Sequence, residues 1–319
     1  MAPPRSLAGM PADADRARIA VLPAGVRTFL ADAVKAGGGE LSSPDQAVAL
    51  VWTETADADG LGRVLDDHAG LRWVQLPWAG VEPYVDVIGA HPDRIWACGK
   101  GVYAEPVAEH ALALALAGLR GLDHFARATS WTGQRGRNLL GARVTIVGGG
   151  GIAESLLRLL GPFGCDVTVV RRTPQPMAGA RSVVGDDRLD EAFTGAELVV
   201  LALPLVPETA GLVDRHRLAL LAPGACLVNV ARGQHVVTDD LVRALRDGTL
   251  GSAGLDVTDP EPLPDGHPLW TLPNAIVTPH TANTQEMALP LLSARITDNV
   301  RRWIAGDPLV GLVDPHAGY

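Results

Sequence analysis

Residues 143–153, which read RVTIVGGGGIA, decide the fold of this 319-residue chain. The apolar run at 144–147 predicts a buried strand, the four glycines predict a tight turn, and residues 152–161 predict a helix. A second apolar run at 166–170 completes a strand-helix-strand unit of about 30 residues. Such units build parallel sheets that are buried on both faces.

The glycine run fits the pattern G-x-G-x-x-[GA]. The first glycine permits a tight turn, the second lets a pyrophosphate approach the backbone, and Ala153 packs the helix close to the sheet. Because the run follows a strand and opens a helix, it predicts a dinucleotide site rather than a glycine turn without a ligand. The cofactor contacts expected here are Gly148, Gly150, Gly151 and Ile152.

The second strand of this unit ends in Arg171-Arg172-Thr173. A dinucleotide site normally has an acidic residue there for the ribose 2′-hydroxyl, whereas an arginine suits a 2′-phosphate. These three residues therefore favour NADP(H) over NAD(H), with Arg171 as the first candidate. The alternative is a solvated arginine pair.

The same alternation of strands and helices covers the whole chain. Strands are expected at 19–22, 47–52, 72–76, 95–97, 198–202, 226–230, 252–256 and 275–278. Helices are expected at 25–36, 60–69, 105–120, 208–220, 238–246 and 285–305. Residues 1–18 are expected to form a frayed tail and residues 121–141 a connector. The pattern predicts an α/β protein with two parallel sheets.

Composition excludes several classes of protein. Hydrophobic residues make up 47% and charged residues 20%, which excludes a disordered or fibrous chain, and a net charge of −9 disfavours a nucleic-acid partner. Residues 111–119 form the most apolar stretch, which is too short to span a membrane. The histidine spacing predicts no metal site. The three cysteines, which suit a reducing cytoplasm, are Cys98, Cys165 and Cys226.

Several further motifs occur in a fixed order. They are A-G-V-E at 79–82, V-A-E-H at 107–110, L-P-L-V-P-E-T at 203–209, V-A-R-G at 230–233, G-L-D-V at 254–257, P-E-P-L at 260–263 and T-P-H at 278–280. In order and spacing the chain resembles the D-isomer-specific 2-hydroxyacid dehydrogenase family, best from about residue 70 to 285.

The resemblance implies two Rossmann-like domains with the cofactor and substrate in the cleft between them. It implies a discontinuous substrate domain, made of 1–104 plus 286–319, and a dinucleotide-binding domain at 105–285. The final helix, at 285–305, agrees with this because it lies beyond the second sheet and could cross back. The family habit also implies a homodimer joined through the nucleotide domains, in which the helix at 105–120 could take part.

Three side chains suit the reduction of a 2-keto acid. Arg232 offers a planar fork for the carboxylate, and His280 can donate a proton to the carbonyl oxygen. Both follow predicted parallel strands, at the sheet edge where ligands bind. Glu261 can hydrogen-bond and orient His280. By the resemblance Arg232, Glu261 and His280 are the catalytic residues; taken singly, each could be an ordinary surface side chain.

The resemblance implies further contacts. Ala79 and Gly80 would hold the substrate carboxylate through backbone N–H groups, and Trp78 would wall the pocket or lie buried. The family often has an asparagine where this chain has Cys98, so Lys100 or Tyr103 could take part instead. Glu109-His110 is expected to serve helix packing. The cofactor contacts implied beyond the glycine run are Pro204, Thr209, Ala231 and Asp256.

We therefore expect an NAD(P)-dependent enzyme that reduces a small 2-keto acid, of the glyoxylate or hydroxypyruvate kind, to the D-2-hydroxy acid. A rival hypothesis is a non-catalytic NAD(P)-sensing protein of the same fold. A second is a phosphoglycerate-type dehydrogenase, which the absence of Lys and Arg from 73–84 opposes and Lys100 favours. A formate-type dehydrogenase ranks below both, since that branch carries glutamine in place of Glu261.

Overall fold

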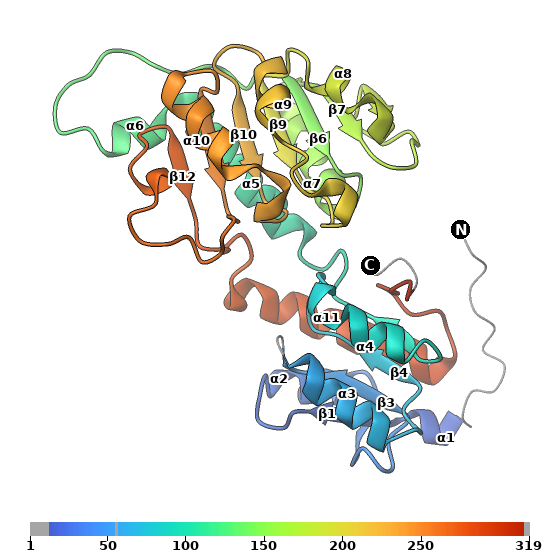
Figure 1. Ribbon diagram of the computed structural model, residues 1–319. Helices are drawn as coiled ribbons and strands as arrows, with labels where there is room; N and C mark the ends of the chain where they lie inside the picture. The colour runs from blue at the N-terminus through green and yellow to red at the C-terminus, as the bar shows by residue number, and fades with distance from the viewer. Residues whose placement is uncertain (1–12, 55–56, 316–319) are drawn as a thin grey trace. The chain divides into compact units, whose positions relative to one another are not determined.

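The computed structural model describes residues 13–54 and 57–315 (Figure 1). The chain divides into two compact units. The first contains the residues up to Tyr103 and those from Gln285 onward, and the second is Ala104–Thr284. Within the described residues no helix combines the length and the apolar character that crossing a bilayer requires.

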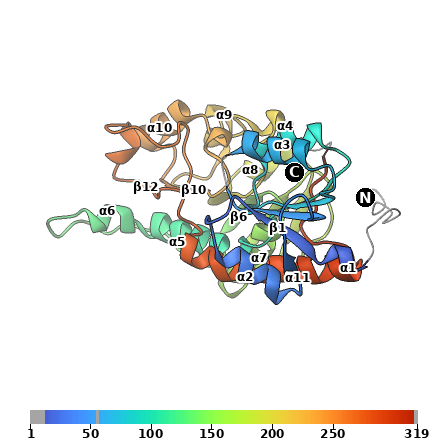
Figure 2. The same ribbon diagram turned by 90° about the horizontal axis from the view of Figure 1, so that it is seen from below.

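The first unit is a five-stranded parallel sheet between two layers of helices. Its strand order is β2-β1-β3-β4-β5, with β1 Arg18–Leu22, β2 Glu40–Leu41, β3 Ala49–Trp52, β4 Trp73–Gln75 and β5 Ile95–Ala97. One face packs on α3 (Ala58–Asp67) and α4 (Val85–Ala90), and the other on α2 (Phe29–Ala36) and α11 (Gln285–Ala305). Figure 2 shows α11 alongside α2.

Helix α11 returns the end of the chain to the first sheet. Its residues Leu292, Ile296, Val300 and Trp303 recur every three or four positions and are all buried in one core cluster with Trp73 of β4. The indole rings of Trp73 and Trp303 have their centroids 5.5 Å apart. The first unit is therefore discontinuous in sequence.

The second unit is a seven-stranded parallel sheet with the order β12-β11-β10-β9-β6-β7-β8. Its strands are β6 Arg143–Val147, β7 Asp166–Val170, β8 Ser182–Val184, β9 Leu198–Leu201, β10 Cys226–Asn229, β11 Ser252–Leu255 and β12 Ala275–Val277. One face packs on α5 (Ala104–Arg120) and α7 (Gly151–Leu160). The other packs on α8 (Leu189–Phe193), α9 (Arg215–Leu220) and α10 (Thr238–Asp247).

Both sheets reverse their strand order once. The reversal lies between β1 and β3 in the first sheet and between β6 and β9 in the second. At such a point the loops that follow the two central strands turn away from each other and leave a crevice at the carboxyl edge of the sheet. Each unit therefore has a defined place for a ligand.

The predicted class, an α/β protein with two parallel sheets, is confirmed. The expected helix at 208–220 is wrong over its first half, where Pro207–Thr209 form a single 3-10 turn and Gly211 has a φ of +62°. Helix α9 begins only at Arg215, because the Asp214 side chain caps it by accepting from the N–H of Arg217.

Other boundaries also differ. The helix expected at 25–36 begins at Phe29, since Gly25 and Arg27 have φ values of +83° and +47° that no right-handed helix contains. Residues 13–16 form the short helix α1 rather than tail, while residues 1–12 lie outside the described part of the chain. The expected connector holds the short helix α6 (Leu122–Ala126). The short elements β2, β8, α4 and α8 were not predicted.

Candidate active site

The glycine turn connects β6 to α7 at the strand-order reversal of the second sheet. Gly148 has a φ of +114°, and a Cβ there would lie 2.0 Å from the carbonyl oxygen of Ala202. At Gly150 a Cβ would meet nothing within 4 Å, so the protein itself does not require that glycine. Open space above a helix N-terminus fits the approach of a pyrophosphate, and Gly151 and Ile152 are the half-buried residues that begin the helix.

The end of β7 lies against this turn. A Cβ on Gly149 would come within 2.7 Å of the Arg171 side chain, so the Arg171 chain runs directly beside the glycine loop. Arg171 is half-buried, whereas Arg172 and Thr173 are exposed. The Arg171 side chain thus lies beside the glycine turn, and its contact with a cofactor 2′-phosphate stays a prediction.

The loop after β9 forms the other side of the reversal. The Thr209 hydroxyl accepts from the N–H of Val206 at 2.9 Å and lies 3.1 Å from the carbonyl oxygen of Pro204. The fully buried His235 ring lies within hydrogen-bond distance of the carbonyl oxygens of Thr209 and Leu203. In this structure Thr209 and His235 shape the loop on which Pro204 is exposed.

Arg232 follows β10 on a loop that has little freedom. The side chain of Asn229 accepts from the N–H of Ala231 at 3.0 Å and donates to the carbonyl oxygen of Arg232 at 2.8 Å. A Cβ on Gly233 would lie 1.9 Å from the carbonyl oxygen of Thr258, so the loops after β10 and β11 are in direct contact. Asn229 was not identified from the sequence. The pattern that could have identified it is an asparagine three residues before Arg232, because such side chains bond to nearby backbone groups.

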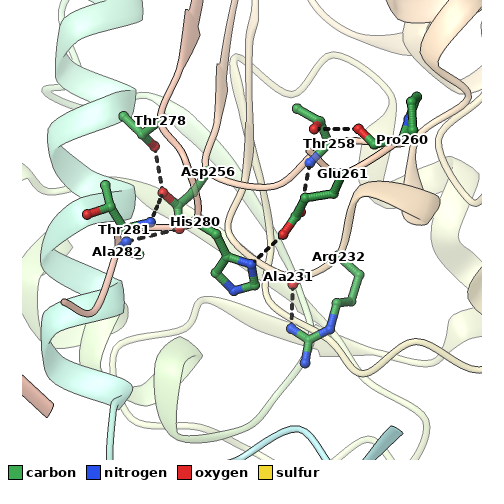
Figure 3. A network of polar contacts seen from close by, with 10 residues as sticks. All are labelled: Ala231, Arg232, Asp256, Thr258, Pro260, Glu261, Thr278, His280, Thr281 and Ala282. Carbon is green, nitrogen blue, oxygen red and sulfur yellow. Dashed lines mark hydrogen bonds and ion pairs between the residues drawn. The ribbon is translucent and has the colours of Figure 1, made fainter. Parts of the chain in front are cut away.

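Glu261 and His280 form a hydrogen-bonded pair next to this contact. Nδ1 of His280 lies 2.7 Å from Oε1 of Glu261, and Oε2 of Glu261 accepts from the N–H of Thr258 at 3.3 Å. In Figure 3 the other ring nitrogen, Nε2, points away from Glu261. The described residues offer no hydrogen-bond partner to Nε2. The histidine is therefore oriented on one side and open to a ligand on the other.

The three predicted catalytic residues come from three successive loops. Arg232 follows β10, Glu261 follows β11 and His280 follows β12, and these strands are neighbours in the sheet. The carboxyl ends of parallel strands meet at one edge, so the fold gathers the Arg232 guanidinium and the hydrogen-bonded Glu261 and His280 there. His280 has a φ of +50°, and its N–H donates to the carbonyl oxygen of Asp256 at 2.8 Å.

Asp256 is the centre of the network that holds the His280 loop (Figure 3). Its side chain is 2% exposed. Oδ1 accepts from the Thr278 hydroxyl at 2.6 Å and from the N–H of Thr281 at 2.9 Å, and Oδ2 accepts from the N–H of Ala282 at 3.0 Å. Burial alone would raise the pKa of the Asp256 carboxyl, but the hydrogen bonds to it outweigh burial and lower that pKa.

His110 extends this network to helix α5. Its Nε2 lies 3.0 Å from the Thr278 hydroxyl oxygen and 3.4 Å from Oδ1 of Asp256. Because the Thr278 hydroxyl donates to Asp256, its oxygen is left to accept a hydrogen from His110. The side chain thus links the helix to the loop that carries His280. The nicotinamide contact predicted for Asp256 stays a prediction.

The remaining predicted contacts lie in the first unit, after β4. Ala79 is exposed, Gly80 and Trp78 are half-buried, and neither the Ala79 nor the Gly80 N–H has an acceptor among the described residues. The hydroxyl of Tyr103 donates to the carbonyl oxygen of Pro77 at 2.8 Å and so holds the start of this loop in place. Cys98 is buried, with Sγ 3.7 Å from the Ala79 carbonyl oxygen, and Lys100 is exposed.

The described residues contain no group of three or more His, Cys, Asp and Glu side chains that could hold a metal ion.

Comparison with known proteins identifies the family of the chain. The family model described as D-isomer specific 2-hydroxyacid dehydrogenase, NAD binding domain, matches residues 110–282. The chain belongs to the D-isomer-specific 2-hydroxyacid dehydrogenase family. The predicted family is thereby confirmed, and the protein is an NAD(P)-dependent oxidoreductase of 2-keto and 2-hydroxy acids.

Individual relatives cover most of the chain. A protein of Serratia proteamaculans named glyoxylate/hydroxypyruvate reductase A is 32% identical over 85% of this chain and 87% of its own. An uncharacterized protein from the proB 3′ region of Corynebacterium melassecola is 38% identical over 78% of this chain and 84% of its own. A Xanthobacter autotrophicus family member, solved in complex with NADPH and MES, is 30% identical with a TM-score of 0.81, covering 95% of this chain and 99% of that one.

Proposed function

We propose that this protein uses NADPH to reduce a small 2-keto acid, of the glyoxylate or hydroxypyruvate class, to the D-2-hydroxy acid. The observation that carries the proposal is the hydrogen-bonded pair of Glu261 and His280, which leaves Nε2 of His280 open at the same edge of the sheet as Arg232. The Serratia relative bears the name of a glyoxylate/hydroxypyruvate reductase, which supports this substrate class.

Each side chain has one task in this reaction. Arg232 binds the carboxylate of the keto acid through its guanidinium and so fixes the carbonyl group. His280, protonated, donates the proton on Nε2 to the carbonyl oxygen, and Glu261 holds Nδ1 and stabilises the positive ring. The nicotinamide cofactor, held on the glycine turn, supplies the hydride. In the reverse direction Nε2 of neutral His280 takes the proton from the hydroxyl.

The preference for NADPH is supported by the Arg171 side chain beside the glycine turn. The 2′-phosphate carries nearly two negative charges, and a charge-assisted hydrogen bond to it is worth about 1.5–3 kcal/mol. The Xanthobacter relative was solved with NADPH, which fits the same preference. We assign Arg172 and Thr173 secondary contacts, because both are exposed.

We further propose that two copies of the chain associate through the nucleotide-binding unit. Three exposed large apolar side chains, Leu122, Trp131 and Leu140, lie on the segment that joins α5 to β6. Trp131 is fully exposed, and exposed apolar side chains that form a contiguous patch mark protein interfaces. Light scattering should give the mass of a dimer, and Trp131→Ser should weaken the dimer if this segment forms the interface.

The activity is tested with purified protein and a panel of glyoxylate, hydroxypyruvate, pyruvate and longer keto acids. Oxidation of NADPH is followed by its absorbance, and the product is identified by chiral chromatography. We expect turnover with the short keto acids and a D-configured product from each of them except glyoxylate, whose product glycolate has no stereocentre. Tight cofactor binding without turnover of any keto acid would instead favour the cofactor-sensing protein.

A further inference from the structure

Arg27 lies half-buried in the first unit, and no carboxylate among the described residues pairs with it. Its guanidinium lies over the ring of Trp78, with Cζ 5.2 Å from the ring centroid, and Nη1 donates to the carbonyl oxygen of Thr53. Within 13–54 and 57–315 no carboxylate pairs with it, and Thr53 supplies its only acceptor. A half-buried cation with unused donors is a binding site for an anion.

Its place in the fold is where a ligand is expected. Arg27 follows β1 and Thr53 follows β3, and the strand order of the first sheet reverses between these two strands. The contact from Arg27 to Thr53 therefore bridges the crevice at the carboxyl edge of the sheet. Trp78, on which the guanidinium rests, follows β4, the next strand in the order.

The surroundings hold Arg27 in this position. The N–H of Thr53 donates to the carbonyl oxygen of Leu22 at 2.6 Å, and its hydroxyl donates to that of Pro23 at 2.9 Å. Trp78 also packs against Tyr103, with the ring centroids 5.5 Å apart, and this contact helps to fix the Trp78 ring. Arg27 also has a φ of +47°, a conformation that is unusual outside glycine and is found often at binding sites.

A second group that can bind an anion follows Trp78 in the chain. Directly after Trp78 come the N–H groups of Ala79 and Gly80, which have no acceptor among the described residues and which we assign to the substrate carboxylate. We propose that Arg27 binds a second anionic group at the far end of the substrate. This inference rests on the proposed function, the reduction of a 2-keto acid, and extends its substrate class beyond glyoxylate and hydroxypyruvate to 2-keto acids that carry a distal carboxylate or phosphate, which we expect to be preferred.

Arg27 supplies a charge that the neighbouring loop lacks. Residues 73–84 contain no Lys or Arg, and from the sequence alone this argues against a doubly charged substrate. Arg27 comes from a different loop and removes that argument, because it supplies the missing positive charge. Glyoxylate has no distal group to reach the guanidinium, and hydroxypyruvate has a neutral hydroxyl. Oxaloacetate and 3-phosphohydroxypyruvate are the probes that place a carboxylate or a phosphate there.

The test compares kcat/KM for hydroxypyruvate, oxaloacetate and 3-phosphohydroxypyruvate in the parent and in Arg27→Gln. We expect the parent to favour at least one doubly charged substrate by about tenfold or more, the effect of one charge-assisted contact. Arg27→Gln should remove that preference and leave hydroxypyruvate nearly unchanged. Arg27→Lys should retain part of it, and Arg63→Gln, an exposed arginine of α3, should change nothing.

A second readout does not depend on turnover. Calorimetry measures the binding of tartronate, which has two carboxylates, and of D-lactate, which has one. The proposal predicts tighter binding of tartronate to the parent and equal affinities in Arg27→Gln. An equal loss for every substrate and both ligands would mean that Arg27 only supports the loops, and would overturn the proposal. Discrimination in binding without reduction of any keto acid would instead refute the proposed function and leave the Arg27 site standing.

Discussion

Replacing Asp256 by asparagine tests how the His280 loop is held. The carboxylate accepts three hydrogen bonds from Thr278, Thr281 and Ala282 and is 2% exposed. Asparagine keeps one oxygen, so one side of the group becomes an NH₂ donor. In either orientation of the amide, at least one buried donor of the loop then faces another donor.

The expected cost follows from these contacts. A buried donor without an acceptor costs about 1–3 kcal/mol, and hydrogen bonds to a charged group are worth about 1.5–3 kcal/mol each. Since part of the network can relax, we expect Asp256→Asn to destabilise the second unit by about 2–4 kcal/mol. For a unit of this size that lowers the midpoint of thermal unfolding by roughly 5–15 °C.

The lowered pKa of Asp256 predicts how the destabilisation by Asp256→Asn depends on pH. The pKa of Asp256 is lowered in the folded protein, so its ionisation stabilises the fold above the ordinary aspartate pKa of about 3.9. That contribution disappears as the pH falls through the lowered pKa. The difference between parent and Asp256→Asn should therefore be full at pH 7 and shrink toward the lowest pH at which both proteins remain folded.

Differential scanning calorimetry over that pH range measures this difference, with Asp265→Asn, an exposed loop aspartate, as the matched control. Activity should fall as well, because the loop positions His280. If Asp256→Asn melts together with Asp265→Asn at pH 7, the carboxylate does not hold the loop and this reasoning is wrong.

Three further predictions concern the reaction. Arg232→Gln should raise KM for the keto acid and lower kcat/KM by about 10- to 150-fold, the loss of a charge-assisted contact, with cofactor affinity nearly unchanged; an unaltered KM would remove Arg232 from the site. Glu261→Gln keeps an acceptor for Nδ1 but removes the negative charge beside the ring that donates the proton, so kcat should fall while KM for the keto acid changes little; an unaltered kcat would contradict this role. Arg171→Asp should lower kcat/KM for NADPH relative to kcat/KM for NADH. A parent protein that already prefers NADH would contradict the assignment of Arg171 to the 2′-phosphate.

Local sequence predicted the elements that have their own signals. The run from β6 through the glycine turn to α7 was predictable because strand, turn and helix each have a distinct pattern over a few residues. Short elements such as β2 and β8 carry too few apolar residues to show a period and gain their hydrogen bonds only from the neighbouring strand. The helix expected at 208–220 failed because the Thr209 hydroxyl and Gly211 favour turns there.

Site residues could be predicted where the chemical type of the side chain and its motif already suggest a role. Arg232, Glu261 and His280 could be named from chemistry and motif spacing, and the structure sets Glu261 and His280 2.7 Å apart. Contacts between distant segments could not be read in the same way. The link from His110 to Thr278 spans 168 residues, and Arg27 meets Trp78 across most of the first sheet. Such pairs form only once the strands have assembled in their order, and a pattern over a few residues does not predict that order.

Transfer of hydride from the cofactor to the keto carbon is the central claim. The most direct measurement incubates the protein with pyruvate and NADPH that carries deuterium in both positions at C4 of the nicotinamide, and analyses the lactate by mass spectrometry and chiral chromatography. The account predicts D-lactate with one deuterium at C2, formed at a strongly reduced rate by His280→Gln. Lactate of L configuration, product without deuterium, or full activity in His280→Gln would contradict it.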